Sequence, residues 1–219
     1  MMYCAAGLKP PVEAIRKQYE AEYGVSVQIN YEGSGTLLSK IKVAPQGDLF
    51  LAADESYVTL AQERGLVEEE IPLASMQPVI AVSRGNPRQI AGLTGLMTDG
   101  VHFGLANPEA AAIGKITRQV LVQSGHWNKL YPKAKVLKPT VSDLANDIKL
   151  QTIDAAIIWD AVANQYPELE IIRAPEFENQ ARNVTVGVLN SSSQPTASLH
   201  FARYLSARDR GSQVFEQFG

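Results

Sequence analysis

The sequence predicts an α/β protein whose sheets are mostly parallel. Strand patterns and helix patterns alternate along nearly all of its 219 residues, the order expected when strands are followed by covering helices. Some strand patterns, such as residues 48–52, are continuous apolar runs, and these are typical of strands covered on both faces. The composition, 45% hydrophobic and 20% charged, fits a globular protein with one large or two small domains.

In the first third of the chain, proline and glycine mark where helices begin and end. Pro10 and Pro11 suit the first turn of a helix, and Gly24 suits its end. Gly65 marks a second helix end. The expected elements are, in order, a strand over residues 3–6, a helix over 10–23, a strand over 25–31, a helix over 36–43, a strand over 48–52 and a helix over 55–64.

The rest of the chain continues the alternation, and a loop over residues 191–195 is expected to cap the penultimate helix. These strands fit either one sheet or two lobes. Strands are expected over 79–82, 102–105, 135–137, 155–158, 170–172 and 184–189, and helices over 115–124, 143–150, 196–205 and 208–218.

Charge and cysteine content exclude several classes of protein. The formal net charge of −3 gives no indication of nucleic acid as a partner. No apolar run is long enough to span a bilayer, and the basic and apolar regions of a signal peptide are missing. The single cysteine, Cys4, lies in an expected strand and cannot form an internal disulfide. We expect it to be a buried core residue.

A Gly-Ser-Gly-Thr turn at residues 33–36 lies between a strand pattern and a helix pattern. Free backbone N–H groups and the positive end of the helix dipole meet at such a place, so an anion can bind there without a cationic side chain. Glycine lets the backbone approach a ligand, and Ser34 and Thr36 add hydroxyl donors. The turn therefore predicts an anion site.

Three other turns of small residues also follow expected strands, at residues 5–8, 107–114 and 139–143. In the last of these, Thr140 or Ser142 is the expected N-cap of the following helix. Open α/β sheets bind ligands at the carboxyl ends of their strands, so four such turns favour a shared pocket. Catalytic motifs are mostly missing: no nucleophile elbow or phosphate loop occurs. The three histidines, His102, His126 and His200, have no acidic or cysteine partner at metal-ligand spacing.

Several segments resemble one family, the molybdate-binding proteins of bacterial ABC uptake systems. The segments are residues 5–8, 23–27, 33–37, 48–55 and 106–109, and they span nearly the whole chain in order. The resemblance implies two α/β lobes with an oxyanion bound in the cleft between them, and closure by hinge bending. Lobe 1 would take residues 1–78 and 190–219, lobe 2 residues 79–189, and the crossover strands 79–82 and 184–189 would form the hinge.

The resemblance also implies which residues bind the ligand. Ser34 matches a ligating serine, with Gly35 beside it, and the other serine position is Gly7, which offers only its backbone N–H. Two backbone N–H donors fall at Ile113 and Val141. A tyrosine donor falls near Trp159, whose indole N–H would replace the phenol.

Two carboxylates beside these positions bear on the ligand. Glu32 and Asp160 would repel a dianion if they pointed inward, and would supply an acceptor for a protonated oxyanion such as phosphate. We expect both to face away.

We therefore expect a monomeric periplasmic solute-binding protein, its signal peptide absent from this sequence, that delivers molybdate or tungstate to the membrane permease of an ABC transporter. No cofactor, no resident metal and no nucleic acid are expected.

The alternatives are a receptor for sulfate, phosphate or a phosphorylated metabolite, and an enzyme acting on such a substrate, which the missing catalytic residues disfavour. A regulator would need a DNA-binding segment that the chain lacks. Ferric iron would need clustered tyrosines, and Tyr31, Tyr57 and Tyr166 are scattered.

Overall fold

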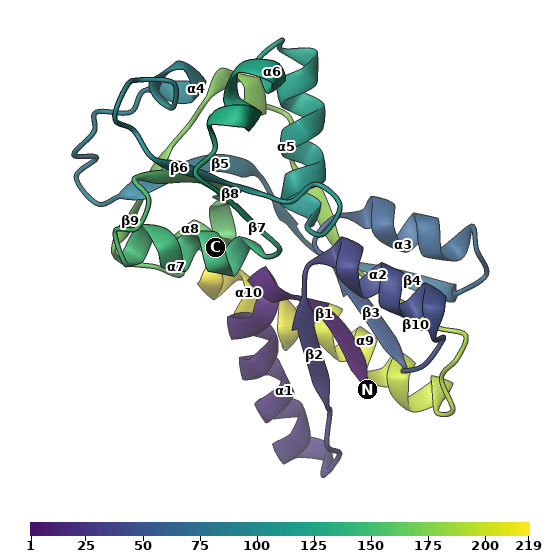
Figure 1. The fold of residues 1–219 in the computed structure, drawn as a ribbon. Helices are drawn as coiled ribbons and strands as arrows, with labels where there is room; N and C mark the ends of the chain where they lie inside the picture. The colour runs from purple at the N-terminus through teal and green to yellow at the C-terminus, as the bar shows by residue number, and fades with distance from the viewer. The chain divides into compact units, whose positions relative to one another are not determined.

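The computed structural model describes residues 1–219, which form two compact units (Figure 1). Unit 1 comprises Met1–Ser75 and Arg182–Phe218, and unit 2 comprises Met76–Ala181 together with Gly219. Each unit contains one five-stranded sheet flanked by helices, so the predicted α/β class is confirmed, with mixed sheets where mostly parallel ones were expected. The lobe boundaries at residues 78 and 190, and the hinge role of the crossover strands, stay predictions.

The sheet of unit 1 has the order β2-β1-β3-β10-β4. β1 pairs in parallel with both β2 and β3, whereas β10 is antiparallel to β3, so the sheet is mixed. Its strands are β1 (Met2–Ala5), β2 (Ile29–Glu32), β3 (Leu49–Ala52), β4 (Val67–Met76) and β10 (Arg182–Leu189). Its helices are η1 (Ala6–Leu8), α1 (Lys9–Tyr23), α2 (Ser34–Val43), α3 (Glu55–Gln62), α9 (Pro195–Ser206) and α10 (Gly211–Phe218).

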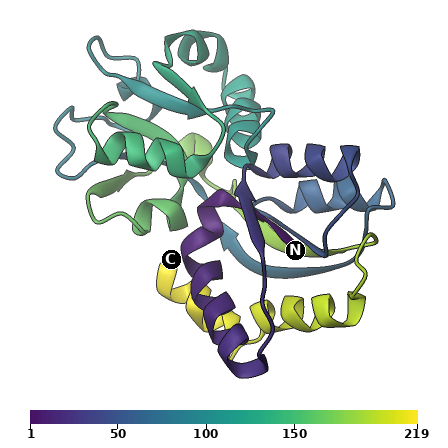
Figure 2. The ribbon, with the colours of Figure 1, turned by 60° about the horizontal axis from the view of Figure 1, so that its bottom comes forward.

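Helices cover both faces of this sheet. α2 and α3 contact each other and the strands on one face, while α1, α9 and α10 pack together on the other (Figure 2). The central strands are therefore shielded on both sides: all four residues of β1 and of β3 are buried. Phe50 at the centre of β3 is fully buried, and so is Cys4 in β1, where burial raises the pKa of its thiol.

Unit 2 repeats the plan with the strand order β7-β6-β8-β5-β9. β6 is parallel to β7 and β8, and β5 is antiparallel to β8 and β9. Helices α5 and α6 contact each other, as do α7 and α8, and each pair covers one face (Figure 1). The strands are β5 (Pro78–Ser83), β6 (Phe103–Ala106), β7 (Val136–Lys138), β8 (Ala155–Trp159) and β9 (Leu169–Ile172), and the helices are α4 (Gly92–Gly95), α5 (Ala112–Gln123), α6 (Trp127–Leu130), η2 (Tyr131–Lys133), α7 (Val141–Lys149), α8 (Asp160–Asn164) and η3 (Pro175–Phe177).

The structure contains three short helices that the sequence did not indicate, α4, α6 and α8, and it differs from the expected strands in two places. The strand expected over 25–31 begins only at Ile29, because the Val27 N–H donates to the Glu20 carboxylate at 2.8 Å and Val25 is exposed. The ten-residue strand β4 was not expected, because its start carries three consecutive glutamates that break the apolar alternation. As the edge strand it can leave these side chains in solvent.

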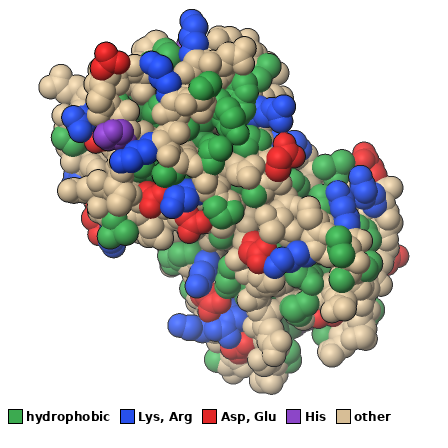
Figure 3. Space-filling view, viewed as in Figure 1, with side chains coloured by type: hydrophobic (Ala, Val, Ile, Leu, Met, Phe, Trp, Pro, Cys, Tyr) green, Lys and Arg blue, Asp and Glu red, His purple; other side chains and the backbone are tan.

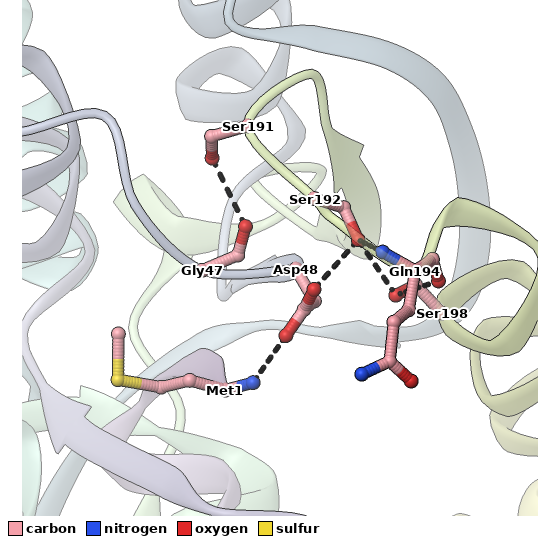
Figure 4. A network of polar contacts seen from close by, with 7 residues as sticks. All are labelled: Met1, Gly47, Asp48, Ser191, Ser192, Gln194 and Ser198. Carbon is pink, nitrogen blue, oxygen red and sulfur yellow. Dashed lines mark hydrogen bonds and ion pairs between the residues drawn. The ribbon is translucent and has the colours of Figure 1, made fainter.

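The loop over residues 191–195 is held at the amino end of β3 by a polar network (Figure 4). The Ser192 hydroxyl donates to Asp48 Oδ1 at 2.6 Å and accepts the Gln194 N–H at 3.1 Å. Ser198 in the first turn of α9 donates back to the Gln194 carbonyl at 2.8 Å. The Met1 amino group also pairs with Asp48. The loop thus holds the start of α9 in place, but it does not cap the helix through a side chain: the N-cap is Gln194, which makes no side-chain capping bond.

Charged side chains of both signs are interspersed over the face drawn in Figure 3, which agrees with the small net charge. None of the helices combines the length and the apolar character that crossing a bilayer requires.

Replacing Phe50 by alanine should lower the free energy of unfolding by about 3–5 kcal/mol, because loss of a fully buried aromatic ring leaves a cavity between the sheet and the helices that cover it. Urea denaturation followed by circular dichroism measures this. Val43→Ala is the matched control: Val43 is 87% exposed and its truncation should change stability by less than about 0.5 kcal/mol. Equal effects of the two substitutions would contradict the packing described for β3.

Candidate functional site

In unit 1, the candidate donors lie at one edge of the sheet. β1, β2 and β3 run in parallel, so their carboxyl ends meet at the same edge. Gly7 lies in η1 directly after β1, Ser34 opens α2 after β2, and Ala53 follows β3. The Ala53 N–H donates to Ser34 Oγ at 3.2 Å, which ties the ends of β2 and β3 together. The sequence prediction that Gly7 and Ser34 share an edge therefore agrees with the strand pairing.

The Ser34 side chain is held in a donor orientation. It is 1% exposed, and its oxygen already accepts the Ala53 N–H. A hydroxyl has one proton to donate, and this bond uses a lone pair instead of the proton. The Ser34 O–H is therefore available to a ligand while its oxygen is anchored.

The first turn of α2 also has free backbone donors. Its N-cap is Gly33, which has no side chain to cap the helix, and the first backbone bond runs from the Leu37 N–H to the Gly33 carbonyl at 3.0 Å. The N–H groups of the three preceding residues, Ser34, Gly35 and Thr36, have no acceptor within the chain. Ser34 and Gly35 are buried, so these donors add to the positive end of the helix dipole in a partly desolvated place.

In unit 2, the parallel strands β6, β7 and β8 likewise end at one edge. The Asn107 N–H donates to the Lys138 carbonyl at 2.8 Å, which joins the ends of β6 and β7. α5, α7 and α8 begin after these strands, so Ile113, Val141 and Trp159 lie at the same edge. The structure thus collects the sequence-predicted donors into one group in each unit.

The α5 N-terminus has the same uncapped form as α2. Its N-cap is Ala111, and the first backbone bond runs from the Lys115 N–H to the Ala111 carbonyl at 3.1 Å. The preceding N–H groups, those of Ala112, Ile113 and Gly114, have no acceptor, although all three residues are buried. Unpaired N–H groups on buried residues are rare in proteins, so this turn is suited to an anionic ligand.

By contrast, α7 carries a side-chain cap. Thr140, one of two residues expected in this role, accepts the Asp143 N–H at 3.2 Å and donates to the Asp143 carboxylate at 2.6 Å. Val141 is the first helical residue, so its N–H points out of the helix start. Trp159, at the end of β8, is 1% exposed and is among the largest fully buried side chains. The ligand role of both residues stays a prediction.

The two carboxylates beside the site are already bonded within their own units. Glu32 pairs with Lys40 on α2. Asp160 Oδ1 accepts the N–H groups of Gln77 and Ala161 at 2.9 and 2.8 Å. The expectation that both carboxylates face away from the ligand stays a prediction.

One buried carboxylate was missed by the sequence analysis. Asp54 is the N-cap of α3, and its Oδ1 accepts the Ser56 N–H at 2.9 Å. The side chain is 1% exposed, and Oδ2 is buried without a hydrogen-bond partner. An aspartate just before the helix pattern at residue 55 is a capping signal that could have identified the first role, but burial of the second oxygen depends on the tertiary fold.

Nothing in the structure provides a cluster of metal ligands. No group of three or more histidine, cysteine, aspartate or glutamate side chains could hold a metal ion. The Tyr31 hydroxyl donates to Glu13 at 2.8 Å, and burial raises the pKa of Tyr31 well above its ordinary value. Burial also raises the pKa of Tyr166. These two phenols therefore stay neutral at neutral pH.

The sequence profile of the bacterial extracellular solute-binding proteins matches residues 1–219, the whole chain. The chain belongs to this family. A binding protein of Haemophilus influenzae is 32% identical over 195 residues, which cover 89% of this chain and 79% of that protein. The molybdate-binding protein ModA of Escherichia coli is 23% identical over 228 residues, covering 100% of this chain and 87% of ModA.

Among solved structures, the periplasmic molybdate-binding protein of Azotobacter vinelandii superposes with a TM-score of 0.83 at 17% sequence identity. The likeness covers 100% of this chain and 97% of that one. At this identity the superposition shows a common fold. The resemblance drawn from the sequence segments is confirmed, and the site residues of this solute-binding protein stay predictions.

Asp54→Asn should leave stability unchanged or raise it, because asparagine keeps the capping oxygen and removes the formal charge from a buried, unpartnered position. Asp54→Ala should lower stability by about 1 kcal/mol through loss of the cap. Thermal and urea unfolding of the ligand-free variants measure both effects. A strongly destabilised asparagine variant would mean that Oδ2 has a partner that only a carboxylate can bind.

Proposed function

We propose that this protein captures a tetrahedral oxyanion, molybdate or tungstate first of all, outside the cytoplasm and delivers it to the membrane permease of an ABC importer. It acts as a monomeric receptor, not as an enzyme, and needs no cofactor and no nucleic acid. The proposed ligand donors are Gly7, Ser34, Gly35, Ile113, Val141 and Trp159.

The observation that carries this proposal is the pair of uncapped helix N-termini. α2 and α5 each begin with three N–H groups that have no acceptor, and most of the residues involved are buried. An oxyanion accepts hydrogen bonds from all its oxygens, so it can replace the water that such donors would otherwise need. The anchored Ser34 hydroxyl adds a further neutral donor.

The nature of the relatives supports a receptor over an enzyme. The family is one of solute-binding proteins, and ModA is named for molybdate. The candidate edges hold no histidine or cysteine that could act as a base or nucleophile: Cys4 is buried inside β1, and His200 lies on α9, hydrogen-bonded to Tyr19 at 2.8 Å. Turnover of a phosphate ester by the pure protein would revive the enzyme alternative.

The engaged carboxylates favour a fully deprotonated ion. A protonated oxygen, as in hydrogen phosphate, needs an acceptor in the site. Glu32 and Asp160 are bonded to other groups. The unpartnered Oδ2 of Asp54, next to Ala53, is an acceptor that supports the phosphate alternative. Molybdate and tungstate carry no such proton at neutral pH, and sulfate would be discriminated by its smaller size. A receptor for sulfate, phosphate or a phosphorylated metabolite is the alternative.

A thermal-shift panel tests the ligand class. Molybdate or tungstate at a thousandfold excess over its dissociation constant should stabilise the protein by about 4 kcal/mol, by mass action. Sulfate, phosphate and ferric citrate should shift the melting temperature less. A shift with sulfate or phosphate alone would contradict the molybdate assignment and support the alternative receptor.

Ser34→Ala should weaken binding of the tightest oxyanion by about 1–3 kcal/mol, the range for a hydrogen bond to a charged partner. Isothermal titration of the variant measures the loss. Ser39→Ala is the matched control on the same helix, because its hydroxyl only bonds back to the Gly35 carbonyl at 2.9 Å. Affinity unchanged by Ser34→Ala would remove Ser34 from the site.

A further inference from the structure

Gly114 occupies a place in the first turn of α5 where no side chain fits. A Cβ atom added to it would lie 2.6 Å from the carbonyl oxygens of both Ala106 and Asn107. Contacts below 3.0 Å with backbone atoms require a shift of the chain, because no flexible side chain is there to give way. Glycine therefore lets the α5 turn pack directly on the carboxyl end of β6.

The backbone that Gly114 packs against is tightly held. The Asn107 N–H donates to the Lys138 carbonyl at 2.8 Å, and the Asn107 carbonyl accepts the N–H groups of Ala110 and Ala111 at 3.1 and 3.0 Å. The Asn107 side chain accepts the Glu109 N–H at 2.9 Å. These four hydrogen bonds hold Asn107 in place. A side chain added at residue 114 would therefore displace the first turn of α5 instead of the Asn107 backbone.

The same turn carries the unpaired N–H groups of Ala112, Ile113 and Gly114. Their direction and spacing depend on how closely the turn rests on Asn107. No capping side chain at Ala111 can readjust to compensate for a displacement.

We propose that Gly114 is a positioning residue for oxyanion binding, because its missing side chain sets where the three N–H groups of the α5 turn lie. This inference rests on the proposed function and refines it: the fit of the ion in unit 2 is determined by a backbone-to-backbone contact. It also adds the N–H groups of Ala112 and Gly114 to that of Ile113 as donors.

Gly114→Ala tests the inference by isothermal titration with molybdate, tungstate and sulfate. The affinity for the tightest ion should fall about tenfold or more, as expected when a hydrogen bond to a charged group loses its geometry. The binding stoichiometry should be unchanged, and the ratio of molybdate to sulfate affinity should shift. A purely structural role would lower the melting temperature without moving that ratio.

Gly104→Ala is the matched control. Its added Cβ would also be crowded, 2.6 Å from Leu144 Cδ2 and 2.9 Å from Ile153 Cδ1, but these are side-chain ends in the core, and Gly104 lies two residues before the end of β6. Its folded fraction should bind each ion with the affinity of the wild type. Equal losses in the two glycine variants, or wild-type affinity and selectivity in Gly114→Ala, would overturn the inference.

If Gly114→Ala does not fold, Ala112→Pro tests whether the N–H groups of the α5 turn bind the ion. Proline at the first helical position keeps the helix and deletes one N–H, and Ala111 has the extended conformation, φ −117° and ψ 140°, that a following proline requires. A folded Ala112→Pro protein should bind the ion more weakly, and unchanged affinity would overturn the inference. Wild-type protein that binds none of the three ions would instead refute the proposed function.

Discussion

The parallel pairing of three strands in each sheet is the constraint on which the candidate site depends. Parallel strands bring their carboxyl ends to one edge, so helices that follow them must begin side by side. Some of these helix starts have no cap. Each buried N–H donor without a partner lowers the stability of the folded protein by about 1–3 kcal/mol. A bound oxyanion would remove that cost, which links ligand capture to the stability of the folded state.

The helices differ in how their first turns are satisfied, and this difference separates structural from candidate binding elements. Asp54 caps α3 and Thr140 caps α7, each through its own side chain. Gly33 and Ala111 cannot do so for α2 and α5. A side-chain cap would compete with a ligand for the same N–H groups, so residues without polar side chains at these two positions keep the donors available.

Local signals allowed much of the fold to be predicted from the sequence, and they also indicated where the candidate site's helix starts lie. The glycine at residue 24 and the Gly-Ser-Gly-Thr turn are short-range patterns: α1 ends just before Gly24 as indicated, and α2 begins at Ser34, two residues before its expected start. β4 was missed because three glutamates on an edge strand do not alternate with apolar residues. The unpartnered oxygen of Asp54 and the crowding at Gly114 depend on segments distant in sequence, which no local pattern reports.

The three glutamates at the start of β4 also affect how the protein self-associates. An edge strand presents unpaired backbone groups to which another chain can add a strand. Glu68, Glu69 and Glu70 are exposed along it, and Pro72 lacks the N–H that such pairing would use. Like charges would face each other in an in-register parallel pairing of two β4 edges, or in an antiparallel pairing centred on Glu69, so the glutamates oppose self-association at high protein concentration in these registers.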